Sequence, residues 1–136
     1  MEHQNSYKGF KELVCWQKGR ELRMTISELV RTFPDAEKYA LTSQITRSAR
    51  SVTANIAEGY GRYTYTDTRR FFIQSRGSAV ETLEHLSVAH DEGYITENTL
   101  EQIEQQCETV IKTINGYIAY LDKVTKERNI QRQPNP

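Results

Sequence analysis

Residues 44–62 read QITRSARSVTANIAEGYGR, and this stretch decides the fold that the sequence predicts. With the five residues before it, it predicts one helix over residues 39–58, because apolar side chains recur at steps of three and four. These side chains are Leu41, Ile45, Ala49, Val52 and Ile56. Gly59, soon followed by Gly61, is typical of a helix C-terminus. The opposite side of the helix mixes small and charged residues, namely Ser43, Arg47, Arg50, Ser51, Ala54 and Glu58.

Outward from this helix, three further apolar stripes predict helices over residues 10–33, 67–92 and 97–126. The first stripe is Cys15, Gly19, Leu22, Ile26, Leu29 and Phe33. The next is Phe72, Arg76, Ala79, Leu83, Leu86 and His90. The last is Ile103, Cys107, Val110, Ile114, Tyr117, Ile118 and Leu121. Short connections favour antiparallel neighbours, so we predict an all-α, up-down-up-down four-helix bundle over residues 10–126. We expect residues 1–9 to be a flexible N-terminus and residues 127–136 a disordered tail.

Three residues do not fit simple stripes. Leu13 and Trp16 lie off the first stripe, where they either cover the end of the bundle or meet a second chain. Gly77 stands in the middle of the third predicted helix, where glycine costs about 1 kcal/mol relative to alanine. We therefore expect Gly77 to allow two helices to approach closely.

The bulk composition indicates one soluble domain. The chain has 136 residues, of which 37% are hydrophobic and 26% charged, as in an ordinary globular protein. No apolar run reaches the roughly 18 residues that a membrane span needs, and the N-terminus has no apolar signal region. Cys15 and Cys107 fit no metal or redox spacing. We predict a cytoplasmic protein with reduced thiols and no membrane association.

Charge is unevenly distributed along this neutral chain. Residues 42–76 contain six arginines and two acidic residues, a net charge of +4, whereas residues 77–111 contain eight acidic residues and no Lys or Arg. Such blocks indicate either complementary packing between segments or a basic surface set against an acidic one. The zero net charge argues against strong, general polyanion binding.

Several short segments occur in an order that carries a family resemblance. They are Phe10-x-x-Leu13, Val14-Cys15-Trp16-Gln17, Phe33-Pro34, Leu41-x-x-Gln44-Ile45-x-Arg47-Ser48-Ala49, Ser51-Val52, Asn55-Ile56-Ala57-Glu58-Gly59, Gly77-Ser78 and Gly93-Tyr94-Ile95. Over residues 8–121 the chain resembles the four helix bundle protein family, also called the 23S rRNA-intervening sequence proteins. Members are encoded within insertions in bacterial 23S ribosomal RNA genes, or resemble proteins that are. The resemblance implies a four-helix bundle that assembles as a ring-like homopentamer.

A related branch of this family is the accessory variability determinant proteins of diversity-generating retroelements. Those proteins are basic, and they bind nucleic acid and a reverse transcriptase. The present chain departs from them because its net charge is zero.

No catalytic or metal-binding arrangement emerges from the sequence. Di-iron bundles use Glu-x-x-His, but the residues three before His85 and His90 are Thr82 and Ser87. Neither cysteine has a basic or glycine-rich setting that would lower its pKa. There is no phosphate-binding loop, nucleophile elbow or dinucleotide fingerprint. We therefore predict a protein that is not an enzyme and has no cofactor and no metal.

The arginine-rich centre of the chain is the candidate nucleic-acid surface. Arginine side chains can contact phosphates, and tyrosines can stack on unpaired bases. The candidate residues are Arg47, Arg50, Arg62, Arg69, Arg70, Tyr63 and Tyr65. The alternative is a solvated face with salt bridges to acidic helices of another subunit.

Two further groups of residues are predicted to have structural roles. Arg76 falls on a buried side, so it needs a polar partner, and Asn55 or Glu58 is the predicted one. These three form a predicted polar network that fixes packing or assembly; a ligand site is the alternative. The predicted oligomer interface consists of Ser51, Ala54, Ile73, Gly77 and Val80. Together these observations predict a self-assembling scaffold that binds RNA or DNA, and the family resemblance implies that the assembly is a homopentamer. The alternative is an oligomeric protein–protein interaction module without nucleic-acid binding.

Overall fold

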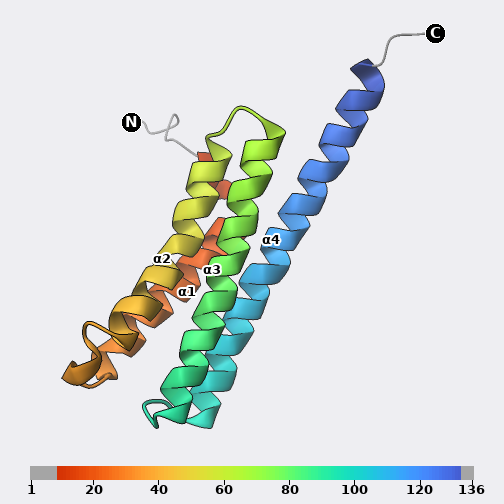
Figure 1. The fold of residues 1–136 in the computed structure, drawn as a ribbon. Helices are drawn as coiled ribbons and strands as arrows, with labels where there is room; N and C mark the ends of the chain where they lie inside the picture. The colour runs from red at the N-terminus through yellow and green to blue at the C-terminus, as the bar shows by residue number, and fades with distance from the viewer. Residues whose placement is uncertain (1–8, 133–136) are drawn as a thin grey trace, which may run out of the picture.

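The computed structural model describes residues 9–132, with side chains described for residues 9–129. Four long helices dominate: α1 (Val14–Leu29), α2 (Leu41–Tyr60), α3 (Tyr65–Asp91) and α4 (Glu97–Arg132). Short 3-10 helices η2 (Gly9–Glu12), η3 (Val30–Thr32) and η4 (Asp35–Glu37) lie before and after α1. The described residues contain no strand, which confirms the predicted all-α fold (Figure 1).

The four helices pack in a closed cycle. α1 contacts α2, α2 contacts α3, α3 contacts α4, and α4 returns to α1. Short connections make consecutive helices antiparallel, as expected for an up-down-up-down bundle. The side formed by α1 and α2 therefore lies opposite the side formed by α3 and α4. This opposition matters below, because the two sides differ in charge.

The predicted stripes of α1, α2 and α4 supply most of the core. All five stripe residues of α2 are buried, with Ile45, Val52 and Ile56 fully so. Leu22 and Ile26 of α1 are equally inaccessible. The buried apolar residues of α4 are Ile103, Cys107, Val110, Ile114 and Ile118. The 3.6-residue period was thus sufficient to locate these three faces.

The buried face of α3 differs from the predicted one. It consists of Phe72, Ser75, Ala79, Thr82, Leu86 and Ala89, whereas Arg76, Leu83 and His90 are only partly buried. Two hydroxyl residues belong to the core because their hydrogen bonds are satisfied inside the bundle. Ser75 Oγ donates to the Val52 carbonyl at 2.7 Å, and Thr82 Oγ1 lies 2.8 Å from Ser48 Oγ. The helix is therefore rotated relative to a purely apolar stripe.

Gly59 serves packing rather than helix termination. α2 continues to Tyr60, and Gly61 takes the C-cap position. A Cβ atom at Gly59 would lie 2.8 Å from the Phe71 Cβ and 3.0 Å from the Phe72 ring. The absence of a side chain at Gly59 therefore allows α2 and α3 to approach closely.

Gly77 shows the opposite of what its mid-helix position predicts. A Cβ atom built there would meet no described atom within 4 Å outside its own backbone surroundings. Gly77 is exposed on α3, so within one chain it does not mediate the predicted close approach. If this glycine serves packing, the partner must come from outside the described chain.

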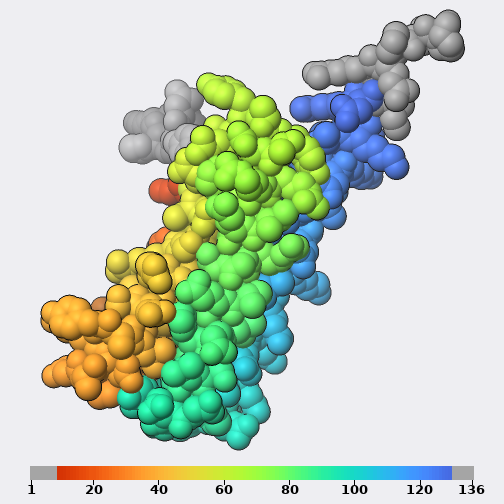
Figure 2. All heavy atoms as spheres, in the orientation of Figure 1, coloured from red at the N-terminus to blue at the C-terminus, as the bar shows by residue number. Residues whose placement is uncertain are grey.

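Helix α4 is longer than predicted. It continues to Arg132, six residues past the expected end at Lys126, and its last turns project past the α2–α3 turn (Figures 1 and 2). The predicted tail therefore begins in helix, and residues 133–136 of it lie outside the described residues. Of the predicted N-terminal segment, residues 1–8 also lie outside them. Within the described part of the chain, no helix combines the length and hydropathy needed to cross a bilayer.

Candidate nucleic-acid interface

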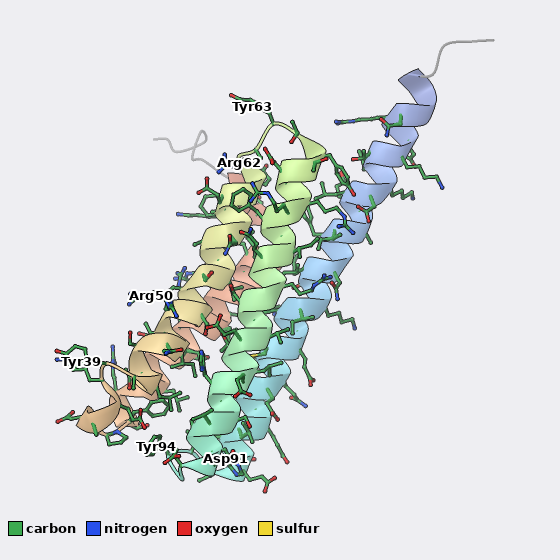
Figure 3. The ribbon with its side chains drawn as sticks, in the orientation of Figure 1. Tyr39, Arg50, Arg62, Tyr63, Asp91 and Tyr94 are labelled. Atoms are coloured by element: carbon green, nitrogen blue, oxygen red, sulfur yellow. The ribbon has the colours of Figure 1, made fainter. Side chains whose placement is uncertain are left out.

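The α2–α3 end of the bundle holds five of the seven predicted nucleic-acid residues. Three of them, Arg62, Tyr63 and Tyr65, lie in or beside the turn, and the other two follow on the first turns of α3 (Figure 3). Tyr63 is fully exposed. Tyr65 is partly buried, because its ring faces α4.

The arginines at this end are paired with acids of the same chain. Arg62 Nη2 lies 2.6 Å from Glu58 Oε2, and Arg70 Nη2 lies 3.5 Å from Asp67 Oδ1. Both guanidinium groups also lie 4.6 Å from the centre of the Phe71 ring, so this ring makes cation–π contacts with both arginines. These contacts compensate the arginine charges and hold the side chains against the protein.

Asp122 of α4 collects the remaining contacts of this end. Arg69 Nε donates to Asp122 Oδ1 at 3.2 Å, and the Tyr65 hydroxyl donates to the same oxygen. The hydrogen bond from Tyr65 is the main cause that lowers the pKa of Asp122. The hydrogen bond and the positive charge of Arg69 lower it further. The hydrogen bond between Tyr65 and Asp122 also raises the pKa of Tyr65, because it stabilises the neutral phenol. The three residues therefore connect α3 to α4.

Arg47 and Arg50 lie on a different surface, along the outer side of α2. Both are exposed, and no ion pair among residues 9–129 includes either of them. Figure 3 shows Arg50 and Tyr39 projecting on the same side of the ribbon, away from α3. They border a surface hollow of about 470 Å³, the Tyr39 hollow, which is lined by Lys38, Tyr39, Thr42, Ser43, Thr46, Arg47 and Arg50.

A second hollow lies between η2, α1 and α2 and shares Arg50 with the first. It measures about 580 Å³, and we call it the Trp16 hollow. Its lining is Phe10, Lys11, Trp16, Arg20, Arg23, Arg50, Thr53, Ala54 and Ala57. We call the two hollows together the basic groove. Six cationic side chains and three aromatic ones line it, and none of its lining residues is acidic.

Parts of the Trp16 hollow are held in place by the bundle. Arg23 Nη1 donates to Thr53 Oγ1 at 2.9 Å, which fixes the guanidinium beside α2. Trp16 is partly buried, packs against the core and meets Phe10 edge-on with ring centres 5.5 Å apart. Leu13 and Trp16 therefore both contact the bundle of their own chain.

Sequence reasoning missed seven of the cationic and aromatic residues of the groove, namely Phe10, Lys11, Trp16, Arg20, Arg23, Lys38 and Tyr39. The four basic residues among them did not stand out, because residues 1–41 contain seven basic and six acidic residues, a net charge of only +1. Around helix α1, however, the charges separate. Lys18 and Glu21 pair on another side, whereas Arg20 and Arg23 face α2. The signal was the spacing of Trp16, Arg20 and Arg23, which places all three on one helical face.

The acidic block lies on the other side of the bundle. Its eight carboxylates belong to α3, to the turn that follows it and to α4, and Figure 3 labels Asp91, the last residue of α3. No ion pair within residues 9–129 joins this block to the arginines of residues 42–76. Glu81 pairs instead with His85, at 3.2 Å. Within one chain the two charge blocks therefore do not neutralise each other through ion pairs between described residues.

The predicted polar network does not form as one unit. Arg76 Nη1 donates to Asn115 Oδ1 of α4 at 2.6 Å, because the rotation of α3 turns this arginine toward α4. Glu58 pairs with Arg62. Asn55 Nδ2 donates to the carbonyl and hydroxyl oxygens of Ser51 at 2.9 Å. These are three separate interactions, and only the last involves a residue of the predicted interface.

The predicted interface residues lie along the outer side of α2 and α3. Ser51 accepts a hydrogen bond from Ser78 at 2.8 Å and so links the two helices. Ala54 and Gly77 are exposed, and Val80 is 52% exposed despite being apolar. Ile73 is partly buried and packs against the core. Of the five residues, Ala54, Gly77 and Val80 are therefore accessible, but Ala54 also lines the Trp16 hollow, and Ile73 borders a hollow lined by Arg69 and Arg70.

The described residues offer no metal site, since no three His, Cys, Asp or Glu side chains gather among them. Both cysteines are buried. Desolvation raises the pKa of the Cys15 thiol to about 11 and that of Cys107 to about 12. Neither thiol is therefore an activated nucleophile at neutral pH.

Comparison with known proteins places the chain in a family. The sequence profile of the 23S rRNA-intervening sequence proteins matches residues 11–116. A crystal structure of a protein of unknown function from the S23 ribosomal protein family of Bacteroides thetaiotaomicron is similar, with a TM-score of 0.72 and 25% sequence identity. The similarity covers 77% of this chain and 98% of that one. No curated protein sequence matches. Because the profile covers most of the chain, the protein belongs to the 23S rRNA-intervening sequence protein family.

Proposed function

We propose that the protein is a nucleic-acid-binding scaffold whose binding surface is the basic groove. The observation that supports this proposal is the set of cations around Arg50 on the α1–α2 side. Lys11, Arg20, Arg47 and Arg50 lie there with no carboxylate of residues 9–129 paired to them. Phosphates would supply the missing negative charge. The family's link to ribosomal RNA agrees with this function without establishing it.

The groove is a better candidate than the α2–α3 end for electrostatic reasons. At that end Glu58, Asp67 and Asp122 each neutralise an arginine, so a phosphate would have to displace a carboxylate. In the groove no such exchange is needed. The acidic block on the opposite side would repel a polyanion and orient the molecule with its groove toward it.

An oligomeric interaction module without nucleic-acid binding is the second candidate function. The opposed basic and acidic sides favour it, because the acidic side of one copy complements the basic side of the next. Such a head-to-tail contact generates a ring when the rotation closes. We propose a homopentamer under either function, and light scattering at micromolar concentration tests it. A monomer mass would refute the ring.

Binding to labelled structured RNA and DNA, measured by fluorescence anisotropy over a salt series, tests the nucleic-acid proposal. We expect the Arg20→Ala/Arg50→Ala variant to bind more weakly. Its log–log salt slope should fall by about 1.4 to 1.8, because each lost phosphate contact removes about 0.7 to 0.9. The Arg62→Ala/Arg70→Ala variant removes the same charge at the α2–α3 end and should retain most of the affinity.

An Arg31→Ala variant serves as the control, since Arg31 is exposed and pairs with Glu28 away from the groove. Absence of binding at low salt would eliminate nucleic-acid binding and leave the interaction module. If the Arg62/Arg70 variant lost affinity and the Arg20/Arg50 variant did not, the binding surface would be the α2–α3 end instead.

A further inference from the structure

We propose that the Trp16 hollow binds an unpaired base, so that the ligand of the basic groove is single-stranded nucleic acid rather than a duplex. This inference rests on the proposed function and specifies its ligand. It combines three features of the hollow, which are an aromatic wall, cations placed around that wall, and a volume within the range of small-molecule pockets.

The aromatic wall is the indole of Trp16. It is only partly buried, and it lines a hollow of about 580 Å³, within the range of small-molecule pockets. Its edge-on contact with Phe10 and its packing on the core hold the ring in one orientation. A ring that is fixed before binding loses little conformational freedom when a base stacks on it. Stacking of bases on aromatic side chains is the sequence-tolerant way in which proteins hold single strands.

The cations surround this ring. Arg20 lies one helical turn from Trp16 on α1, Arg23 follows it, and Arg50 approaches from α2. The Arg23 guanidinium is anchored to Thr53, so its direction is set. A nucleotide whose base enters the hollow therefore carries its phosphate toward positive charge. Arg50 also borders the Tyr39 hollow, where an 87% exposed tyrosine offers a second aromatic surface to the continuing strand.

A duplex does not match this geometry. Its bases are stacked on one another, so their faces are not available to the indole, and reaching the hollow would require unstacking at a cost of a few kcal/mol. A duplex could contact only the outer guanidinium groups. The groove thus combines phosphate contacts, which either form of nucleic acid can make, with a base contact that only an unpaired nucleotide can make.

The chain provides a direct reporter, because Trp16 is its single tryptophan. The experiment titrates the full-length protein with three probes while Trp fluorescence and anisotropy are recorded. The probes are a single-stranded oligonucleotide of about eight nucleotides, a blunt duplex of the same sequence, and inorganic polyphosphate. We expect the single strand to quench Trp16 and to bind about tenfold more tightly than the duplex. Polyphosphate should bind without comparable quenching, because it has charge but no base.

Two variants separate stacking from folding. Trp16→Leu keeps an apolar side chain against the core and removes the flat ring, and it should lower single-strand affinity about tenfold while duplex affinity stays unchanged. Tyr120→Leu is the matched control, since Tyr120 is 57% exposed on α4 outside the groove. Equal affinity and equal quenching by single strand and duplex would overturn the inference while the proposed function stands. So would unchanged single-strand affinity in Trp16→Leu. If no probe binds at low salt, the proposed function itself fails.

Discussion

Replacing Gly59 with alanine tests the close contact of α2 with α3. Alanine is the better helix former by about 1 kcal/mol, so propensity alone predicts stabilisation. The new Cβ, however, would lie 2.8 Å from the Phe71 Cβ and 3.0 Å from the Phe72 ring. Carbon atoms prefer roughly 3.5–4.0 Å, so two helices must separate by about 1 Å. The Phe71 Cβ is fixed to the backbone and cannot rotate away.

Overpacking of this kind costs about 1–3 kcal/mol, and the rigid neighbour places Gly59→Ala toward the upper end. After subtraction of the propensity gain, we expect a net destabilisation of about 1–2 kcal/mol. For a chain of this size the melting temperature should fall by about 3–8 °C. Thermal unfolding followed by circular dichroism at a fixed protein concentration measures this shift.

Gly77→Ala is the matched control, because it makes the same chemical change where no described atom lies within 4 Å. Here only propensity acts, and we expect stabilisation by about 0.5–1 kcal/mol. A Gly59→Ala variant as stable as the wild type would refute the packing argument. A fall in the melting temperature of Gly77→Ala would contradict an open position and would indicate that another copy packs on that strip.

Three further predictions concern thiols, buried hydroxyls and acid stability. With thiol pKa values of about 11 and 12, Cys15 and Cys107 should resist iodoacetamide at pH 8 and react only in urea; stoichiometric labelling of native protein would refute their burial. Ser48→Ala and Thr82→Val should show a coupling energy of about 1 kcal/mol in a double-mutant cycle by urea unfolding, and strict additivity would contradict their hydrogen bond. The lowered pKa of Asp122 means that its contribution to stability is present above about pH 4 and is lost as the pH falls. Asp122→Asn should therefore be less stable than wild type at pH 7, and this difference should shrink as the pH falls below about 4, whereas a constant difference would exclude this origin.

The sequence predicted the buried face of a helix correctly where that face consists of apolar residues. The stripes of α1, α2 and α4 are apolar, so helical periodicity located their buried faces. The predicted buried face of α3 was wrong because Ser75 and Thr82 have polar side chains that are nevertheless fully buried. Their partners, Val52 and Ser48, lie on another helix, and no pattern within α3 contains that information.

The two glycines illustrate the same limit. Gly59 and Gly61 were predicted to mark the end of a helix, which Gly61 does at the C-cap, and Gly77 was predicted to bring helices together, yet Gly59 is the one at the close contact. The role of a glycine depends on which atoms face it across the bundle, and this is a tertiary property. Helix propensity indicates only that glycine destabilises a helix relative to alanine.

The candidate site was predicted only in part. Arg47 and Arg50 were predicted to bind nucleic acid, and both line the basic groove. The groove also includes residues of η2 and α1, which were not predicted. Charge summed along the chain hid those residues, because Arg20 and Arg23 are interleaved with Glu21. Only the arrangement around the helix axis separates them.

Asp122 sets the length of helix that unfolds with the bundle. It lies four residues beyond Ile118, the last buried residue of α4, and it is held by two side chains of α3. Within residues 9–129, no side-chain hydrogen bond or ion pair involves a residue after it. Helix α4 therefore continues for ten residues, about 15 Å, from residue 123 to Arg132, and those of its side chains that are described make no such contact. Terminal helical turns without tertiary contacts lie at the low end of local stability, so we expect them to open and close locally. Amide exchange along α4 is thus divided at Asp122 into a slow part that reports the whole bundle and a fast part that reports only fraying.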